Sequence, residues 1–189
     1  MTTTFLSEAA ERLRLSVARI VNEERANGMG AAIAWRSGLF VTSAHVVTSP
    51  RVHVMTPDGR TVPGEVVARD VHRDVAIVRV PGARMPVVRT ADPATLRPGS
   101  LVFAVGHPFG VVDAVSAGVF QAVGWLPSGL ELSKERLRWV QADVRLGPGN
   151  SGGPLADSEG RVIGVSAMIV AGLALAVPST DVDAMLAGV

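Results

Sequence analysis

Ser151 lies in the densest run of small and turn-forming residues in the chain, GPGNSGGPL, which extends from Gly147 to Leu155. A serine hydroxyl can attack a carbonyl group when a neighbouring base accepts its proton, and histidine is the usual base. The same residue types are also common in purely structural turns. The choice between these interpretations therefore depends on partners for Ser151 elsewhere in the chain.

One formal match can be rejected at once. Gly149 to Gly153 fits the pattern G-x-S-x-G, the nucleophile elbow of the α/β-hydrolases. In that class a helix follows the serine, and the acid and the histidine come later in the chain. Here no histidine follows Ser151, and the next segment is rich in strand-forming residues. The partners must therefore lie upstream.

Two further chain orders are known for a serine triad, Asp-His-Ser and His-Asp-Ser. The first could use only His72 or His107, because the earliest aspartate is Asp58. The second can use His45 with Asp74, and their local contexts favour it. His45 follows the apolar run LFVTS and precedes a proline, so we expect it in a short, rigid turn at the end of a strand.

Asp74 begins DVAIVRV, a strand that we expect to be apolar on both faces, with Val75 and Ile77 on one and Ala76, Val78 and Val80 on the other. An ionised carboxylate beside such a strand is costly unless a donor meets it, and a histidine N–H is a suitable donor. We therefore predict a triad in which Asp74 orients His45, His45 accepts the proton of Ser151, and Ser151 Oγ attacks the carbonyl carbon.

The glycines around Ser151 predict an oxyanion hole. Two backbone N–H groups must point at one position to stabilise a tetrahedral oxyanion, and this requires a tightly curled backbone. Gly149 can adopt conformations that are closed to other residues. We assign the two donors to the N–H groups of Gly149 and Ser151, with Asn150 shaping the turn.

These residues are expected to be held by β-strands. From Ala31 onward, short runs rich in Val, Ile, Ala and Thr alternate with Gly, Pro, Asp and Ser, which is typical of an all-β sandwich or barrel. Two prolines around residue 95 indicate the main internal boundary. We expect two β subdomains, residues 1–95 and 96–189, which together form one functional unit.

Short helices are expected at both ends of the chain. Ser7 and the acids after it predict a helix start, with apolar residues at helical spacing as far as Ile20. The stretch SVARIV could equally be the first strand. Near the other end, Ser179 is a good N-cap for a short helix that ends at Leu186.

Composition argues against several classes of function. The net charge is +1, which gives no reason to expect nucleic acid or an anionic membrane as a partner. There is no cysteine, and the four histidines lack metal-ligand spacing, so we expect no disulfide, metal or cofactor. Neither a secretory signal nor a membrane span is present, so the chain as it stands is expected to be cytoplasmic, or periplasmic or secreted if its N-terminus has been trimmed.

Together these features resemble the trypsin-like, chymotrypsin-fold serine proteases, and among them the high-temperature-requirement (HtrA, Deg) group. The matching segments are GLFVTSAHVV, HRDVAIVRV, VGHPFGVVDAVSAGVF, GPGNSGGPL, GRVIGVSAMIV and LALAVPSTDVDAML. The resemblance implies two six-stranded antiparallel β-barrels, with His45 and Asp74 in the first and Ser151 in the second. It also implies a serine endopeptidase that cleaves flexible or unfolded protein segments in the cleft between them.

The resemblance further implies where substrate and partner molecules bind. The strand GVSAMIV would pair with an extended substrate, and Ser166, Ala167 and Met168 would help to form the P1 pocket. The N-terminal segment around Phe5 would form the contact in a homotrimer. No PDZ domain is expected after Val189, although one usually follows in this group.

Two residues depart from the pattern of the group. Arg145 stands on the approach to the P1 pocket, where a small apolar residue is usual. If it pointed into the pocket it would favour acidic P1 residues, whereas we expect it to point to solvent and leave a small aliphatic preference. Asn150 replaces the aspartate that binds a new N-terminal amine in digestive enzymes, so we expect neighbouring loops or subunits to order the turn.

Two other functions remain open from the sequence. A protease fold can serve as a catalytically silent peptide-binding or chaperone module, although an intact triad disfavours that function. An esterase could use the same triad. Of the remaining histidines, we expect His53 on the barrel surface, His72 in solvent and His107 as a hydrogen-bonding loop residue.

Overall fold

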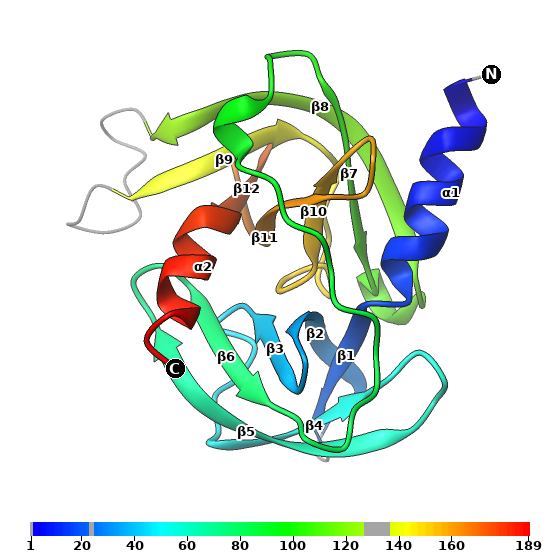
Figure 1. Ribbon diagram of the computed structural model, residues 1–189, viewed down its shortest axis with the longest axis vertical. Coiled ribbons are helices and arrows are strands. Elements are labelled where there is room, and N and C mark those ends of the chain that lie inside the picture. Colours follow the sequence, from blue (N-terminus) through cyan, green and yellow to red (C-terminus); the bar gives the residue numbers. More distant parts are fainter. Residues whose placement is uncertain (1, 23–24, 127–136) are drawn as a thin grey trace.

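Two closed antiparallel β-barrels form the structure (Figure 1). The computed structural model of the chain describes residues 2–22, 25–126 and 137–189. The first barrel, in spatial order β1-β2-β3-β6-β5-β4, consists of β1 (Val17–Asn22), β2 (Arg25–Arg36), β3 (Leu39–Thr42), β4 (Arg51–Met55), β5 (Thr61–Asp70) and β6 (Val75–Arg79). The second, in order β10-β11-β12-β9-β8-β7, consists of β7 (Leu101–Gly106), β8 (Ala114–Trp125), β9 (Arg138–Asp143), β10 (Pro154–Asp157), β11 (Val162–Val170) and β12 (Leu173–Pro178). The predicted all-β architecture of two six-stranded barrels is confirmed.

Strand β6 shows how the hydrophobic core is divided. Its side chains alternate between two faces, as the period of two along a strand requires. Ala76 and Val78 pack inside the first barrel, whereas Val75 and Ile77 join a cluster that contains residues of both barrels. All four are fully buried, as the sequence predicted. Asp74, the residue just before β6, is therefore held in place by a strand that packs into two hydrophobic clusters.

Helix α1 (Thr2–Arg14) packs on the second barrel through its buried residues Ala9, Ala10 and Leu13. The helix begins earlier than the predicted start at Ser7. It ends at Arg14 because the chain turns there into β1, so the strand alternative is correct for the stretch SVARIV.

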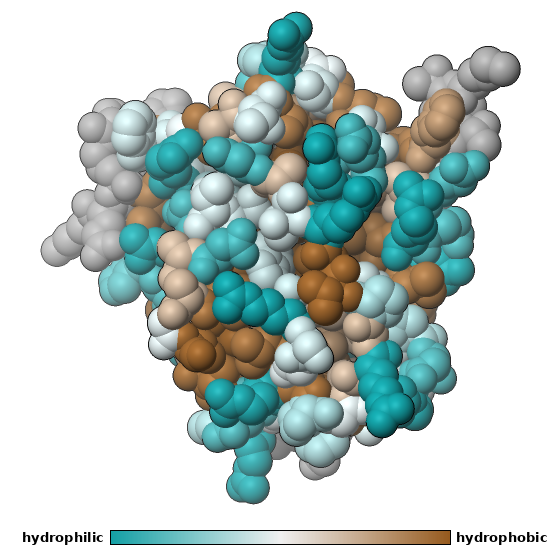
Figure 2. Space-filling view, viewed as in Figure 1, coloured by the Kyte–Doolittle hydropathy of each residue, from teal (hydrophilic) through white to brown (hydrophobic). Residues whose placement is uncertain are grey.

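Helix α2 (Ser179–Leu186) connects the end of the second barrel to the first. Trp35 Nε1, at the end of β2, donates a hydrogen bond of 2.8 Å to Asp183 Oδ1 in this helix. On the face in Figure 2, hydrophobic side chains gather where α2 meets the first barrel. The predicted N-cap role of Ser179 is wrong, because a proline occupies the N-cap position and the Ser179 hydroxyl donates to Ala91 O at 2.7 Å instead.

The segment between the barrels forms hydrogen bonds with both of them. Val88 N donates to Ala34 O in the first barrel, and Ala91 N donates to Val162 O in the second, each at 3.0 Å. The 3-10 turn η1 (Pro93–Thr95) follows, and the boundary predicted after residue 95 lies at its end. A second such turn, η2 (Pro108–Gly110), lies between β7 and β8. No helix in the described ranges combines the length and the apolar character that a membrane span requires.

Candidate active site

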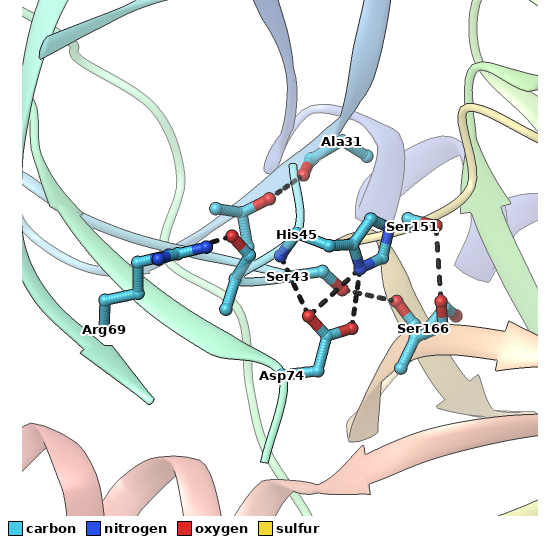
Figure 3. A network of polar contacts seen from close by, with 10 residues as sticks. Ala31, Ser43, His45, Arg69, Asp74, Ser151 and Ser166 are labelled. Carbon is cyan, nitrogen blue, oxygen red and sulfur yellow. Dashed lines mark hydrogen bonds and ion pairs between the residues drawn. The ribbon is translucent and has the colours of Figure 1, made fainter. Parts of the chain in front are cut away.

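A cleft of about 360 Å³ lies beside Ser151. The first barrel contributes His45 to its lining, and the second contributes residues 146–151 and 167–169. In Figure 3 the ring of His45 lies between Asp74 and Ser151. The three residues predicted to carry the chemistry are therefore brought together, although they come from segments far apart in the sequence.

His45 lies in a turn that follows β3. Val46 N donates to Ser43 O at 3.1 Å, which closes the turn around the histidine. From strand β5 of the same barrel, Arg69 Nε donates to Ala44 O at 3.0 Å (Figure 3). The backbone on both sides of His45 is thus held by hydrogen bonds, while about half of its side chain stays exposed to solvent.

Asp74 is buried and has a left-handed backbone conformation, with φ of 57°. Aspartate tolerates this conformation better than most residues, and here it turns the carboxylate back toward the histidine. Asp74 Oδ1 accepts a 2.9 Å hydrogen bond from His45 N, and Asp74 Oδ2 lies 2.8 Å from His45 Nδ1. Two donors from one residue therefore compensate the burial of this carboxylate.

The hydroxyl of Ser151 is directed to the second barrel. Its Oγ donates to Ala167 O on β11 at 3.3 Å, and no hydrogen bond joins it to the ring of His45 in the described part of the chain. Catalytic hydrogen bonds are often long or absent without substrate and tighten in the complex. A rotation about the Cα–Cβ bond of Ser151 is the movement that would bring Oγ to His45.

The turn before Ser151 leaves two backbone donors free. Gly149 has φ of +106°, a conformation that L side chains rarely adopt. Asn150 is buried, and its N–H donates to Gly147 O at 3.0 Å. The N–H groups of Gly149 and Ser151 have no acceptor among the described residues. These are the two donors that the sequence assigned to an oxyanion hole.

The residues predicted to bind substrate on β11 divide into two groups. Ala167 and Met168 line the cleft together with Ile169, which the sequence analysis did not single out. Ser166 lies behind the turn instead, because its carbonyl accepts Gly152 N at 2.7 Å and its buried hydroxyl has no partner in the described structure. We therefore place Ser166 in the scaffold of the turn and not in the cleft.

Arg145 does not line the cleft. It is exposed and borders a separate surface hollow together with Asp143 and residues 116–119 of β8. The next residue, Leu146, lines the cleft in its place. Arg145 thus points to solvent, as expected, and as a candidate substrate-binding residue it makes no contribution to the lining of the cleft.

A seam of hydrogen bonds joins the two barrels behind the nucleophile. Ala31 N donates to Ser151 O at 2.8 Å. The buried Ser43 hydroxyl donates to Ser166 O at 3.1 Å, as Figure 3 shows. Ala31 and Ser43 could not be identified from the sequence, because no pattern in the chain indicates which strands meet across the barrels. The seam fixes how the segment that contains His45 lies relative to Ser151.

Comparison with known proteins identifies the family. Residues 28–165 match the model of the trypsin-like peptidase domain, which covers well over half of the chain. The chain belongs to the trypsin-like peptidase family. Its relatives include putative serine protease HhoB of Synechocystis sp., 37% identical over 161 residues that cover 82% of this chain and 39% of that protein. The mitochondrial serine protease HTRA2 of Drosophila pseudoobscura pseudoobscura is 36% identical, with 85% of this chain and 38% of that protein covered.

Solved structures agree with this family assignment. The HtrA-type protease AlgW with a tripeptide superposes with a TM-score of 0.84 at 26% identity, covering 96% of this chain and 62% of that one. The same protease with a decapeptide gives a TM-score of 0.83 at 23% identity and supports the fold alone, covering 96% of this chain and 66% of that one. This trypsin-like peptidase domain spans about two fifths of the length of its curated relatives.

The other histidines of this peptidase domain lie outside the cleft. His53 is partly buried on β4, and His72 is exposed in the loop before Asp74. His107 is buried, and its Nδ1 accepts a hydrogen bond of 3.1 Å from Asp113 N. No group of three potential metal ligands occurs in the described ranges.

Gly152→Ala is expected to destabilise the peptidase fold by roughly 2–5 kcal/mol. Gly152 has φ of +82°, and an added Cβ would collide with Ala31 O and Thr42 Oγ1 in the seam. Gly38→Ala is the matched control, because Gly38 has φ of +72° but nothing within 4 Å of a new Cβ. Urea unfolding monitored by tryptophan fluorescence should give a clearly larger loss for Gly152→Ala. Equal losses would show that the seam does not constrain this position.

The pH dependence of peptidase activity should follow His45. The hydrogen bond with Asp74 raises the pKa of His45 above its ordinary value of 6.5; burial opposes the shift and the Asp74 charge adds to it. Because the base must be neutral, kcat/KM should rise with pH with a midpoint above 6.5. The stabilising effect of protonated His45 on the fold is lost over the same range, as pH rises through the raised pKa.

This prediction is checked by kcat/KM profiles of the wild type and of His72→Asn, which replaces an exposed histidine outside the cleft. The two profiles should coincide. A midpoint at or below the ordinary histidine value in the wild type would contradict the assignment of His45 as the base.

Proposed function

We propose that this chain is a serine endopeptidase that cleaves flexible or unfolded protein segments, with His45, Asp74 and Ser151 as its catalytic triad. The observation that carries the proposal is the meeting of three features at one cleft. They are the His45–Asp74 pair from the first barrel, the hydroxyl of Ser151 from the second, and two N–H groups beside that hydroxyl that have no acceptor within the described ranges. Membership of the trypsin-like peptidase family supports the same chemistry.

In the proposed reaction, Ser151 first turns from Ala167 O toward His45. Its Oγ then forms a bond to the carbonyl carbon of the scissile peptide while His45 Nε2 accepts the proton. His45 passes that proton to the leaving amine as the peptide C–N bond breaks, which leaves an acyl group on Ser151. Water then attacks the acyl carbon, His45 accepts the proton of the water, and the Ser151 hydroxyl is restored as the carboxylic acid leaves.

Asp74 and the turn act on different charges during these steps. Asp74 accepts from His45 Nδ1, which leaves Nε2 free to accept a proton and stabilises the imidazolium that forms. The N–H groups of Gly149 and Ser151 donate to the oxyanion of each tetrahedral intermediate. Because these N–H groups have no acceptor in the described part of the chain, little rearrangement precedes their use.

The lining of the cleft indicates the substrate class. Leu146, Met168 and Ile169 are apolar, and the exposed Arg145 lies elsewhere, so we propose a small aliphatic residue at P1. An extended segment lying along the cleft edge of β11 would be bound mainly through its backbone, which tolerates many sequences. Flexible or unfolded chains can adopt that extended conformation, whereas folded domains cannot.

We propose in addition that copies of this chain associate through helix α1, in a homotrimer. Phe5 is 68% exposed on this helix, so its ring is available for an apolar contact between copies. Sedimentation of the wild type and of Phe5→Ser would test this part of the proposal, and a monomeric wild type would refute it.

The proposed activity is tested by labelling with a fluorophosphonate probe, followed by peptide mass mapping of the labelled residue. We expect label on Ser151 and none on other serines, together with digestion of a chemically unfolded protein but not of its folded form. Absence of label would refute both enzymatic functions and favour a peptide-binding module. Label on Ser151 with cleavage of esters but not of unfolded protein would favour an esterase.

A further inference from the structure

The loop that joins β7 to β8, residues 107–113, lies against the turn that presents the nucleophile. His107 N donates to Gly149 O at 3.1 Å, and Phe109 N donates to Pro148 O at 2.9 Å. The two backbones are so close that a Cβ atom added to Gly149 would collide with His107 O. The loop therefore contacts the peptide groups that define the candidate oxyanion hole.

The hydrogen bond from Phe109 N has a geometric consequence for Gly149. The Pro148 carbonyl and the Gly149 N–H belong to one peptide group, which is planar and trans, so the two point in opposite directions. Holding the Pro148 carbonyl toward the loop therefore directs the Gly149 N–H away from it, on the side of the cleft. If the peptide rotated, the N–H would be lost as a donor to the oxyanion.

The loop cannot be expected to hold this shape by local preference alone. Phe109 and Asp113 have φ of 52° and 58°, left-handed values that are unfavourable for residues other than glycine. Phe109 is also 79% exposed, so burial of its ring does not compensate the strain. Contacts elsewhere in the loop must stabilise it.

The ring of His107 supplies such a contact. It is buried, with 5% of the residue exposed, and its Nδ1 accepts the N–H of Asp113 at 3.1 Å, so the ring closes the loop from its first residue to its last. Nδ1 can accept only when it carries no proton. The neutral ring with its hydrogen on Nε2 is therefore the form that closes the loop.

The surroundings of the ring favour a neutral imidazole over a protonated one. Burial lowers the pKa of His107 below its ordinary value, and the charge of Arg19 on β1 lowers it further, while Asp113 and the Ala18 carbonyl oppose the shift. Asp113 Oδ1 lies 3.8 Å from His107 Nδ1, and Asp113 Oδ2 lies 3.5 Å from Nη1 of Arg14. The Asp113 carboxylate is thus shared between the ring and a guanidinium group at the end of α1.

We infer that His107 is a positioning residue for the oxyanion hole: its ring closes the 107–113 loop, and the closed loop holds the Pro148–Gly149 peptide in its active orientation. The inference rests on the proposed function for its effect on catalysis. It goes further by assigning a role to a histidine that lies outside the cleft and touches no substrate.

Two measurements test whether the His107 ring closes the 107–113 loop, without any assay of activity. In 15N NMR spectra of the wild-type protein at neutral pH, His107 Nδ1 should be unprotonated and Nε2 protonated. In His107→Phe, which keeps a planar ring but has no acceptor, the amide protons of Phe109 and His107's replacement should exchange at least about tenfold faster. The amide of Phe103, in the core of β7, should exchange as in the wild type.

Kinetics test the consequence for catalysis. Loss of one oxyanion donor typically lowers kcat by about 10²–10³-fold, so His107→Phe should lower kcat by at least about tenfold with KM nearly unchanged. His107→Asn should recover most of this loss, because its carboxamide oxygen can accept the Asp113 N–H. His72→Phe is the matched control and should keep wild-type kcat.

A protonated His107 Nδ1 in the wild type, or unchanged amide exchange at Phe109 in His107→Phe, would overturn the inference that the His107 ring closes the loop. The NMR result decides the matter if His107→Phe does not fold. Normal kcat in a folded His107→Phe would equally overturn it. If the wild type is not labelled by fluorophosphonate, the proposed function fails, whereas exchange and NMR still decide whether His107 holds the loop.

Discussion

Ser151→Ala is expected to lower kcat for peptide hydrolysis by about 10⁶-fold, since no other group in the proposed site can form the acyl intermediate. The side chain is only partly buried, and the one hydrogen bond that it forms within the described residues, to Ala167 O, is long at 3.3 Å. Its removal should therefore change the free energy of unfolding by no more than about 1 kcal/mol. Active-site-titrated kinetics on a peptide substrate, together with urea unfolding, measure both quantities.

Ser158→Ala is the control, because Ser158 is exposed in the turn between β10 and β11 and lies outside the cleft. It should keep wild-type kcat. A Ser151→Ala protein that retained more than about a hundredth of wild-type kcat would show that another nucleophile, or bound water, carries the reaction.

Asp74→Asn is expected to lower kcat by about 10⁴-fold with little change in stability. Asparagine tolerates the left-handed backbone at this position, so the fold should be preserved. The new amide nitrogen would face His45 Nδ1 as a donor, which forces the ring hydrogen onto Nε2. Nε2 could then no longer accept the proton of Ser151, and the measurement is kcat near neutral pH.

Asp58→Asn is the control for Asp74→Asn. It shows whether replacing a hydrogen-bonded aspartate elsewhere in the chain also lowers kcat. Asp58 is fully exposed in a turn, where bonds from Thr56 and Arg60 lower its pKa to about 2. This variant should keep wild-type activity. A loss below about tenfold in Asp74→Asn would mean that Asp74 serves mainly to shape its turn.

Several features of the fold followed from local patterns. The burial of both faces of β6 could be predicted from the run VAIV. Alternate residues of a strand lie on opposite faces, and here the residues of both faces are apolar. Gly149 beside the nucleophile predicted a backbone conformation that other residues rarely adopt, and its φ in the structure is positive. By contrast, Ser179 has the composition of an N-cap, yet the packing of α2 places its hydroxyl on Ala91 O. Local preference could not reveal that competing acceptor.

In the candidate site, too, some features could be predicted from the sequence and others were set by tertiary packing. Residue types and their order along the chain selected His45, Asp74 and Ser151, and the structure places them at one cleft. The sequence did not indicate that Ser151 Oγ would turn to Ala167 O, or that Arg145 would lie outside the cleft. Those outcomes depend on which backbone groups of β11 and β8 lie nearby, and strand register across a barrel is a long-range property.

By itself, the sequence determined the all-β class with two β subdomains, the identity of the reactive groups and the small residues that allow a curled turn around Ser151. These are properties of side-chain chemistry and of short-range periodicity. Only the tertiary structure decided how the barrels meet at Ala31 and Ser43, and which loop supports the Pro148–Gly149 peptide. The physical reason is that a backbone N–H or C=O is the same in every residue, so its partner is set by the approach of distant segments and leaves no mark in the local sequence.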